Sequence, residues 1–276
     1  MGDRAVSLRI RVYHSITILQ ENAMNETNFT RHRAVEFTRN NVIQIKRLLP
    51  NDKVGACNVF LLIEEFIAPR NAMATEAKLS NSEVFCYLFE GALLQSNSTG
   101  SVNIIEEGGA YHLVSGKGLE YWYMPIADHA VCHGIQICLN VPPSQAKSDP
   151  QQDSWREVQL PETHNKGSTT HYIVGDGSPV SAAIPLLLQD TTIRSQAHTF
   201  VAVPENMQGL AYCYRGRIEI GGAVMERGEF IVLPHHTELV ASGLSESGIM
   251  LLAGVPLRAA DAKKAGSIKH VSTGFY

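Results

Sequence analysis

Residues 87–95 of this 276-residue chain read YLFEGALLQ, and residues 212–220 read YCYRGRIEI. Aligning the two segments places Gly91 opposite Gly216. Each segment is rich in aromatic and branched apolar residues on both sides of its glycine, which is typical of two strands joined at a turn. A strand pair that occurs twice in one chain is the first sign of a duplicated β domain.

A second pair of matching segments lies a little further along each copy. Residues 105–114 read IEEGGAYHLV and residues 225–234 read MERGEFIVLP, which aligns Gly108 with Gly228. Each copy therefore runs as strand, glycine turn, strand, and then an acidic-glycine turn into another strand. The repeat predicts two related β domains in tandem.

The rest of the chain fits an all-β protein. Other short segments rich in Val, Ile, Phe and Tyr are separated by Gly, Pro, Asn or Ser, and no long amphipathic helical pattern occurs, which favours sandwiches or barrels. A polar stretch at about residues 142–171 suppresses regular structure. We therefore divide the chain into an N-terminal extension (1–33), a first domain (34–160) and a second domain (161–276).

Composition narrows the classes of partner. Hydrophobic residues make up 44% and charged residues 18%, which suits a globular protein with a substantial core. The formal net charge is −4, so nothing predicts binding to nucleic acid or to an anionic membrane. No apolar run approaches the roughly 20 residues of a membrane-spanning helix. The expected partners are small molecules or other proteins.

Cysteine usage and the N-terminus bear on localisation. Five cysteines without a Cys-x-x-Cys pair predict neither a disulfide framework nor a zinc knuckle, which favours an intracellular, reducing compartment. The first twenty residues contain Arg4, Arg9 and Arg11 and only Asp3 among the acids, a composition similar to a mitochondrial transit peptide. The same residues include VSLRIRVY, whose alternation also predicts a strand. Cytoplasm and mitochondrion both stay open.

The segment SGKGLEYWYMP at residues 115–125 contains a Gly-Lys-Gly turn. It lacks the G-x-x-x-x-G-K-[ST] spacing of a phosphate loop and continues as a strand, so a phosphate site is not predicted. A period of two places Leu119, Tyr121 and Tyr123 on one face. In a small barrel, that apolar face is the one expected to point inward.

An ordered series of segments resembles the pirins, the two-domain members of the cupin superfamily. The resemblance covers roughly residues 34–269 and is carried by IKRLLPNDKVGACNVFLLIEEF, EVFCYLFEG, GGAYHLVSGKGLEYWYMP, CHGIQICLNVPPS and LLAGVPLR. It implies an all-β fold of two tandem cupin barrels, each a double-stranded β-helix or jelly roll.

The resemblance also implies a metal site, usually for iron, held by three His and one Glu inside the first barrel. The first two ligand positions fall on Ala77 and Leu79, counted back from the Glu-Gly pair that ends the next strand. The other two, just after the Gly-Lys-Gly turn, fall on Tyr121 and Tyr123. Alanine and leucine have no donor atom, and a neutral phenol is a poor ligand. We therefore expect no metal cofactor, although tyrosinate binds ferric iron in some proteins.

Other polar residues could in principle form a replacement metal or acid–base site. His133 lies in phase with the apolar residues of an alternating strand, so we expect a hydrogen-bonded histidine inside the barrel, with His133 as a secondary pocket candidate. Glu64 and Glu65 are neighbours in a strand and must lie on opposite faces. We expect both to be solvated charges and not an acid–base pair.

These observations favour a pirin-like protein that has lost its metal site, a pseudoenzyme acting in protein–protein contacts or in a larger assembly. The space around the four former ligand positions is expected to be filled by the tyrosine rings, or else to hold a planar organic ligand. The pirin resemblance implies a rival function, a metal-dependent oxidoreductase of the quercetin dioxygenase type, whose redox chemistry requires a cofactor.

Overall fold

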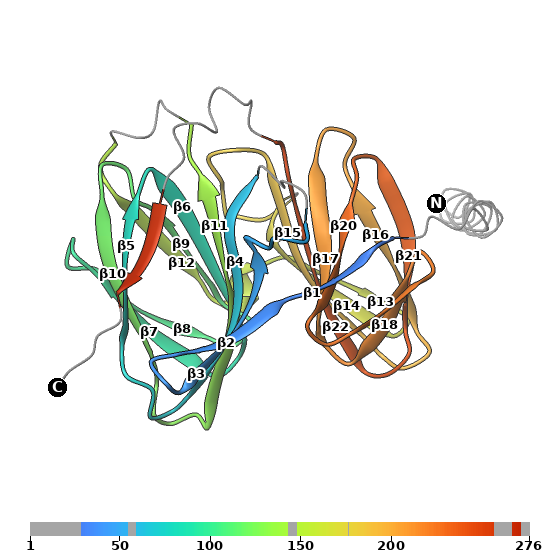
Figure 1. Ribbon diagram of the computed structural model, residues 1–276, viewed down its shortest axis with the longest axis horizontal. Coiled ribbons are helices and arrows are strands. Elements are labelled where there is room, and N and C mark those ends of the chain that lie inside the picture. Colours follow the sequence, from blue (N-terminus) through green and yellow to red (C-terminus); the bar gives the residue numbers. More distant parts are fainter. Residues whose placement is uncertain (1–28, 55–58, 143–147, 176, 257–266, 272–276) are drawn as a thin grey trace, which may run out of the picture.

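A computed structural model of the chain describes residues 29–54, 59–142, 148–175, 177–256 and 267–271. It shows two β-barrels side by side, joined by segments that pass between them (Figure 1). Each barrel is built from two sheets, and the regular structure of the described residues is β-strand apart from one 3-10 turn, η1 (Glu157–Gln159). The expectation of an all-β fold with two cupin-type barrels is confirmed. No helix among these residues is long and apolar enough to cross a membrane.

The first barrel consists of a seven-stranded sheet in the order β12-β9-β6-β11-β4-β3-β2 and a five-stranded sheet in the order β23-β5-β10-β7-β8. Its strands are β2 (Val35–Arg39), β3 (Ile43–Leu49), β4 (Phe60–Pro69), β5 (Thr75–Ser80), β6 (Ser82–Glu90), β7 (Ala92–Asn97), β8 (Val102–Glu106), β9 (Ala110–Val114), β10 (Leu119–Pro125), β11 (Val131–Asn140), β12 (Gln151–Trp155) and β23 (Ser267–Val271).

The second barrel consists of a seven-stranded sheet in the order β1-β20-β17-β22-β15-β14-β13 and a four-stranded sheet in the order β16-β21-β18-β19. Its strands are β1 (Arg31–Arg33), β13 (Glu162–Asn165), β14 (Ser168–Val174), β15 (Leu186–Ile193), β16 (His198–Val203), β17 (Gln208–Arg215), β18 (Arg217–Ile220), β19 (Ala223–Glu226), β20 (Glu229–Leu233), β21 (Thr237–Gly243) and β22 (Ser247–Gly254).

The internal repeat corresponds to matching turns in the two barrels. Gly91 follows β6 with φ +82°, and its counterpart Gly216 follows β17 with φ +73°. Gly108 and Gly228 precede β9 and β20 with φ +70° and +87°. Side chains other than glycine rarely adopt this left-handed conformation. The aligned glycines therefore supply the left-handed backbone conformation at equivalent turns of the two barrels, as a duplicated fold requires.

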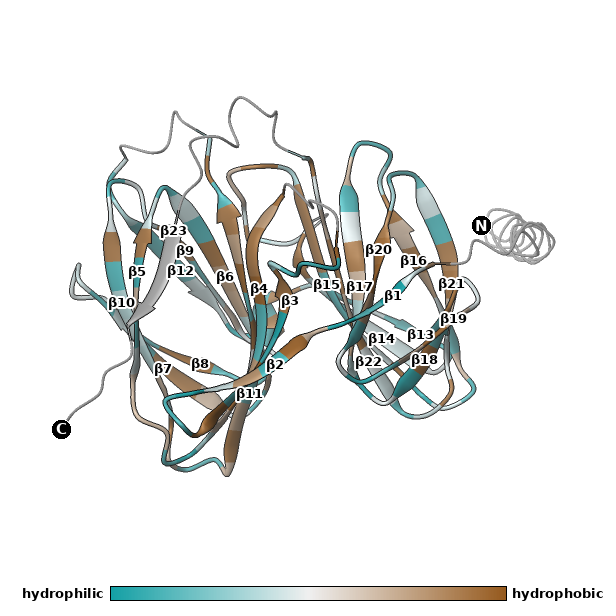
Figure 2. Cartoon of the chain, viewed as in Figure 1, coloured by the Kyte–Doolittle hydropathy of each residue, from teal (hydrophilic) through white to brown (hydrophobic). Residues whose placement is uncertain are grey.

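The two seven-stranded sheets pack face to face between the barrels, so their central strands are covered on both sides. In β4, Ile63 belongs to the core between the barrels, whereas Leu62 and Phe66 belong to the core inside the first barrel. Double coverage explains why β4 and β6 read as nearly continuous apolar runs, and much of both strands is brown in Figure 2. Strands buried on both faces hold the two barrels together.

Two terminal strands cross between the barrels. β1 pairs with β20 of the second barrel, at the position that β12 holds beside β9 in the first (Figure 1). β23 pairs with β5 of the first barrel. The division of the chain at residue 160 stays a prediction. The structure shows in addition that the N-terminal strand β1 belongs to the second barrel and the C-terminal strand β23 to the first. We predicted a possible targeting segment within residues 1–33. Residues 1–28 of it lie outside the described residues.

Candidate functional site

The four residues at the ligand positions implied by the pirin resemblance lie together inside the first barrel. β5 and β10 are antiparallel neighbours in which Ala77 is paired with Tyr121, and Leu79 with Leu119. Ala77 and Tyr121 are 0% exposed, Leu79 3% and Tyr123 5%. All four belong to one apolar cluster, and the tyrosine rings lie 6.0 Å apart between centroids. Leu119, Tyr121 and Tyr123 thus face inward, as the alternation predicts.

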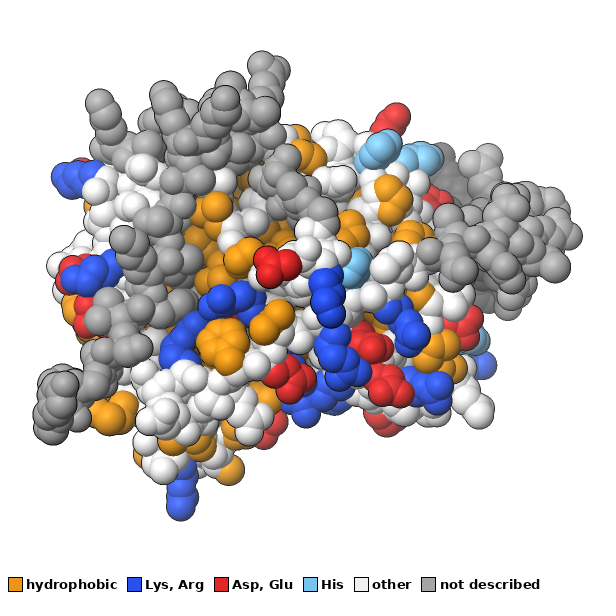
Figure 3. Space-filling view, in the orientation of Figure 1, with side chains coloured by type: hydrophobic (Ala, Val, Ile, Leu, Met, Phe, Trp, Pro, Cys, Tyr) orange, Lys and Arg blue, Asp and Glu red, His pale blue; other side chains and the backbone are white. Residues whose placement is uncertain are grey.

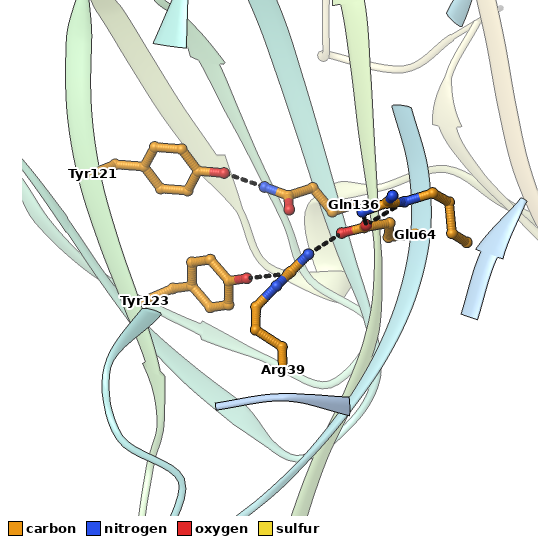
Figure 4. A network of polar contacts seen from close by, with 6 residues as sticks. Arg39, Glu64, Tyr121, Tyr123 and Gln136 are labelled. Atoms are coloured by element: carbon orange, nitrogen blue, oxygen red, sulfur yellow. Dashed lines mark hydrogen bonds and ion pairs between the residues drawn. The ribbon is translucent and has the colours of Figure 1, made fainter. Parts of the chain in front are cut away.

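Each of the two phenols has a polar partner from another strand (Figure 4). Gln136 of β11 donates a hydrogen bond from Nε2 to the Tyr121 hydroxyl. Arg39, at the end of β2, donates from a guanidinium nitrogen to the Tyr123 hydroxyl over 3.3 Å. A positively charged side chain, itself only 9% exposed, therefore lies against one of the four residues at the implied ligand positions.

Glu64 neutralises this buried guanidinium. One carboxylate oxygen of Glu64 lies 2.8 Å from Arg39, and the other accepts hydrogen bonds from Arg47 at 2.6 and 2.8 Å (Figure 4). Glu64 is 1% exposed, so the expectation that it is a solvated charge is wrong. The reason is tertiary: β2 and β3 bring two arginines over β4, and their pairing allows a carboxylate to be buried there.

The electrostatics of this network oppose a metal ion. Burial, followed by the neighbouring Tyr123, raises the pKa of Tyr121 well above its ordinary value. Burial also raises the pKa of Tyr123 to about 12, although Arg39 acts in the opposite direction. Both phenols therefore stay protonated at neutral pH. Two residues without donor atoms, two neutral phenols and a resident guanidinium do not fit the His and Glu set that such a metal requires.

The second polar cluster lies between the barrels and is built around Glu65. His133 Nε2 lies 2.7 Å from Glu65 Oε1, Tyr212 donates its hydroxyl proton to Oε2, and Arg227 lies 3.5 Å away. Glu65 is 1% exposed, which corrects the expectation of a solvated charge. We expected His133 inside the first barrel, and this expectation is wrong. His133 lies on the face of β11 that packs against the second domain.

A third buried carboxylate comes from the second domain. Tyr87 and Tyr214 donate hydrogen bonds to the two oxygens of Asp190 over 3.1 and 2.7 Å. Tyr87 belongs to β6 and Tyr214 to β17, so this carboxylate also joins the two barrels. Burial raises the pKa of Asp190, although both tyrosines stabilise its charged form.

A cavity of about 570 Å³ opens between the barrels beside these clusters. His133, the secondary pocket candidate from the sequence, lines it. The other lining residues come from both barrels and from the segment that joins them: Gln44, Ile67, Tyr87, Leu88, Phe89, Glu90, Glu107, Gly108, Val131, Glu157, His171, Asp190, Thr192, Tyr214, Arg215 and Arg227. On the face shown in Figure 3, acidic and basic side chains are intermixed, without a large area of one sign.

Replacing Glu65 with glutamine is expected to make the free energy of unfolding depend less on pH in the acid range. Burial opposes ionisation of Glu65, but hydrogen bonds from His133 and Tyr212 outweigh it and lower its pKa. Such an acid stabilises the fold above its unfolded-state pKa, and this stabilisation is lost as pH falls through the lower folded-state pKa. Urea unfolding across the acid range should therefore show a smaller pH-dependent loss in E65Q than in the wild type.

The pKa of Asp190 is shifted in the opposite direction to that of Glu65, so its variant should have the opposite effect on the pH dependence of stability. Its folded-state pKa is raised, so its contribution to stability is greatest below the unfolded-state pKa and is lost as pH rises through the folded-state pKa. The conservative variant D190N lacks this gain on acidification and should lose stability more steeply than the wild type as pH falls. Parallel curves for the wild type and both variants would contradict the assignment of these two carboxylates.

Comparisons with known proteins agree with this architecture. Residues 188–263 match the family model of the pirin C-terminal cupin domain. Human pirin is 24% identical over 78% of this chain and 78% of its own length. Among solved structures, quercetin 2,3-dioxygenase from Acinetobacter baumannii has a TM-score of 0.75 at 17% identity, covering 84% of this chain and 80% of that one. The bacterial pirin YhhW from Escherichia coli, solved in complex with nickel(II), has a TM-score of 0.65 at 13% identity, covering 83% and 100%.

The sequence interpretation missed the residues that contact the two phenols. Neither Arg39 nor Gln136 is among the predicted site residues: Arg39 lies 84 residues from Tyr123, and Gln136, although only 15 residues from Tyr121, belongs to another strand, β11. The one available signal was the polarity of Gln136 within the apolar segment GIQIC, whereas Arg39 lies among polar residues in EFTRNN. Buried polar side chains need partners, but the sequence does not say which partners they have.

Proposed function

We propose that this homologue of the pirins is a metal-independent, non-catalytic protein that acts as an interaction or assembly subunit. The observation that carries the proposal is the Arg39 guanidinium, which is buried against Tyr123 and paired with Glu64 where the family resemblance implies a metal. Arg39 and Arg47 share the single carboxylate of Glu64, so the cluster keeps a net positive charge, which repels a divalent cation.

The filled interior of the first barrel also favours a structural role over binding at this position. Ala77 and Tyr121 are fully buried, and Gln136 satisfies the Tyr121 hydroxyl. Close packing of these side chains stabilises a core. The network therefore substitutes for the metal as the element that joins the strands of this barrel.

An interaction role is supported by apolar side chains on an exposed sheet edge. β8 is the last strand of its sheet, and its residues Val102 and Ile104 are 63% and 60% exposed. Edge strands with exposed apolar residues are ready sites for pairing or docking with another chain. This edge lies in the first barrel, on the sheet that faces away from the second domain.

The alternative is a metal-dependent oxidoreductase related to quercetin 2,3-dioxygenase, the name carried by one structural neighbour. Redox chemistry with oxygen requires a metal or another cofactor. Since the four residues at the implied ligand positions supply no ionised donor, we do not extend that activity to this chain.

The proposal is tested by loading the purified full-length chain with Fe(II) or Ni(II) under anaerobic conditions, beside human pirin as a reference. We expect the metal content after gel filtration to stay far below one ion per chain, and metal addition to produce no turnover of quercetin. Stoichiometric metal that is lost in the Tyr121→Phe and Tyr123→Phe variants would overturn the proposal, because it would show that the phenols serve as ligands.

A further inference from the structure

The cavity between the barrels has the size and walls of a small-molecule site. Its volume of about 570 Å³ falls within the range of roughly 300–1,000 Å³ found for ligand pockets. It is formed where two domains meet, which is a frequent location for such sites. It is separate from the metal position implied in the first barrel, because the lining residues include none of the four at that position.

Aromatic rings form part of the wall. The Phe89 and Tyr214 rings are stacked, with centroids 3.9 Å apart and planes inclined by 13°, although they come from different barrels. Tyr87 meets Phe89 edge-on at 5.6 Å. Aromatic faces attract cations and pack against flat apolar groups. The wall therefore suits a ligand that has an aromatic body, a positive charge, or both.

Acidic side chains gather beside these rings. Glu107 and Glu157 are exposed, line the cavity and form no ion pair with any described residue. Glu157 lies against the residue after Glu107, because a Cβ atom added at Gly108 would come within 2.7–2.9 Å of the Glu157 side chain, and both acids act electrostatically on Tyr87. Two neighbouring carboxylates without a cationic partner favour a positively charged ligand.

The remaining charges must be counted as well. Glu90, which is exposed, and the buried Asp190 add two acids to the lining. Arg227 lies on Glu65, so its charge is already compensated. Arg215 is exposed and forms no direct ion pair with any described residue, although its charge acts on Asp190.

His133 and His171 complete the set of titratable side chains in the wall. His133 is held by Glu65, and His171 lies 3.7 Å from Glu162. Both of these glutamates lie outside the lining, and the lining itself contains four acids and two arginines. The excess is negative, and the acids without partners are concentrated beside Tyr87, whose pKa is raised by burial and then by the charges of Asp190, Glu157 and Glu107.

We propose that this cavity binds a small organic cation, an ammonium or guanidinium group carried on a flat apolar body. The positive group lies against Glu107 and Glu157, and the apolar body lies against Phe89 and Tyr214. This binding is independent of the metal question in the first barrel, because the two regions share no lining residue. Either proposal can therefore fail without the other.

The test uses three probes of similar size that differ in charge: benzylammonium, benzyl alcohol and benzoate. Each is titrated into the full-length chain and followed by ligand-observed NMR. We expect benzylammonium to bind with a Kd on the order of 1 mM, as its few atoms allow. Benzyl alcohol and benzoate should bind at least about fivefold more weakly, since they lack the attraction to the carboxylates.

Variants that remove the charge of exposed residues test whether benzylammonium is attracted by the acids and repelled by the arginine. The double variant E107Q/E157Q should weaken benzylammonium binding roughly threefold to tenfold, whereas R215Q should strengthen it about twofold to fivefold. E106Q is the matched control, because Glu106 is an exposed neighbour of Glu107 that does not line the cavity. It should leave the Kd unchanged.

Each result decides for or against the proposal. Selective binding of benzylammonium with opposite responses in E107Q/E157Q and R215Q supports it. Tighter binding of benzoate, equal binding of all three probes, no measurable binding of benzylammonium, or a change in E106Q as large as that in the double variant overturns it. All three variants alter exposed side chains, so loss of folding does not obscure the outcome, and circular dichroism verifies this.

Discussion

Replacing Glu64 with alanine is expected to lower the free energy of unfolding by about 3–5 kcal/mol, the range typical of breaking a buried ion pair. Arg39 would lose its carboxylate partner while its side chain stays almost fully buried. Its pKa is raised, because the effects of Tyr123 and Glu64 outweigh burial, which acts to lower it. An unpaired guanidinium in the barrel interior cannot recover the hydration that it lost on folding.

The matched control for this prediction is Glu120→Ala on the outer face of β10. Glu120 lies 2.6 Å from Lys78, as close as Glu64 lies to Arg47, but the side chains of Glu120 and Lys78 are 44% and 51% exposed. An exposed ion pair contributes only about 0–1 kcal/mol. Urea unfolding of both variants should therefore separate them by several kcal/mol, and equal losses would show that Glu64 is not a structural charge.

A double variant distinguishes an unpaired charge from lost packing. In R39L/E64L, both partners are replaced by apolar side chains, which often restores most of the stability lost when one partner is removed. We expect R39L/E64L to be more stable than E64A. If it is as unstable as E64A, packing around these side chains and not charge pairing accounts for the loss.

Rebuilding the implied ligand set should create a metal site. The variant carries Ala77→His, Leu79→His, Tyr121→His and Tyr123→Glu, together with Arg39→Met to remove the competing cation. Because Ala77 and Tyr121 are cross-strand partners, their replacements lie side by side within one barrel. We expect Ni(II) affinity to rise by about three orders of magnitude or more over the wild type, since donor number and charge dominate such affinities.

Isothermal titration calorimetry measures this gain, and one further variant tests the contribution of Arg39. The four ligand substitutions without Arg39→Met should bind Ni(II) more weakly, because the guanidinium pairs with the new glutamate. Glu64 keeps Arg47 as a partner in the five-fold variant, so the fold is not left with a lone buried carboxylate. Failure of a folded five-fold variant to take up metal would show that the ligand register is wrong.

Much of the fold could be predicted from the sequence because it depends on local chemistry. The glycines at 91 and 216 occupy equivalent left-handed turns, and alternation places Tyr121 and Tyr123 inside the barrel. Turn conformation and strand alternation are properties of a few consecutive residues. For that reason the duplicated β architecture and the inward orientation of the two tyrosines could be predicted without coordinates, whereas the assignment of the four ligand positions rests on the pirin resemblance and stays a prediction.

The tertiary structure alone decided which charges are buried and what they contact. Glu64 and Glu65 are adjacent in β4 and read as solvated acids, yet one pairs with arginines inside the first barrel and the other with His133 between the barrels. Likewise, Arg39 reaches Tyr123 only because distant strands meet there. Whether a charge is buried depends on partners brought together from distant parts of the chain, and their electrostatic pairing is set by folding and not by neighbours in sequence.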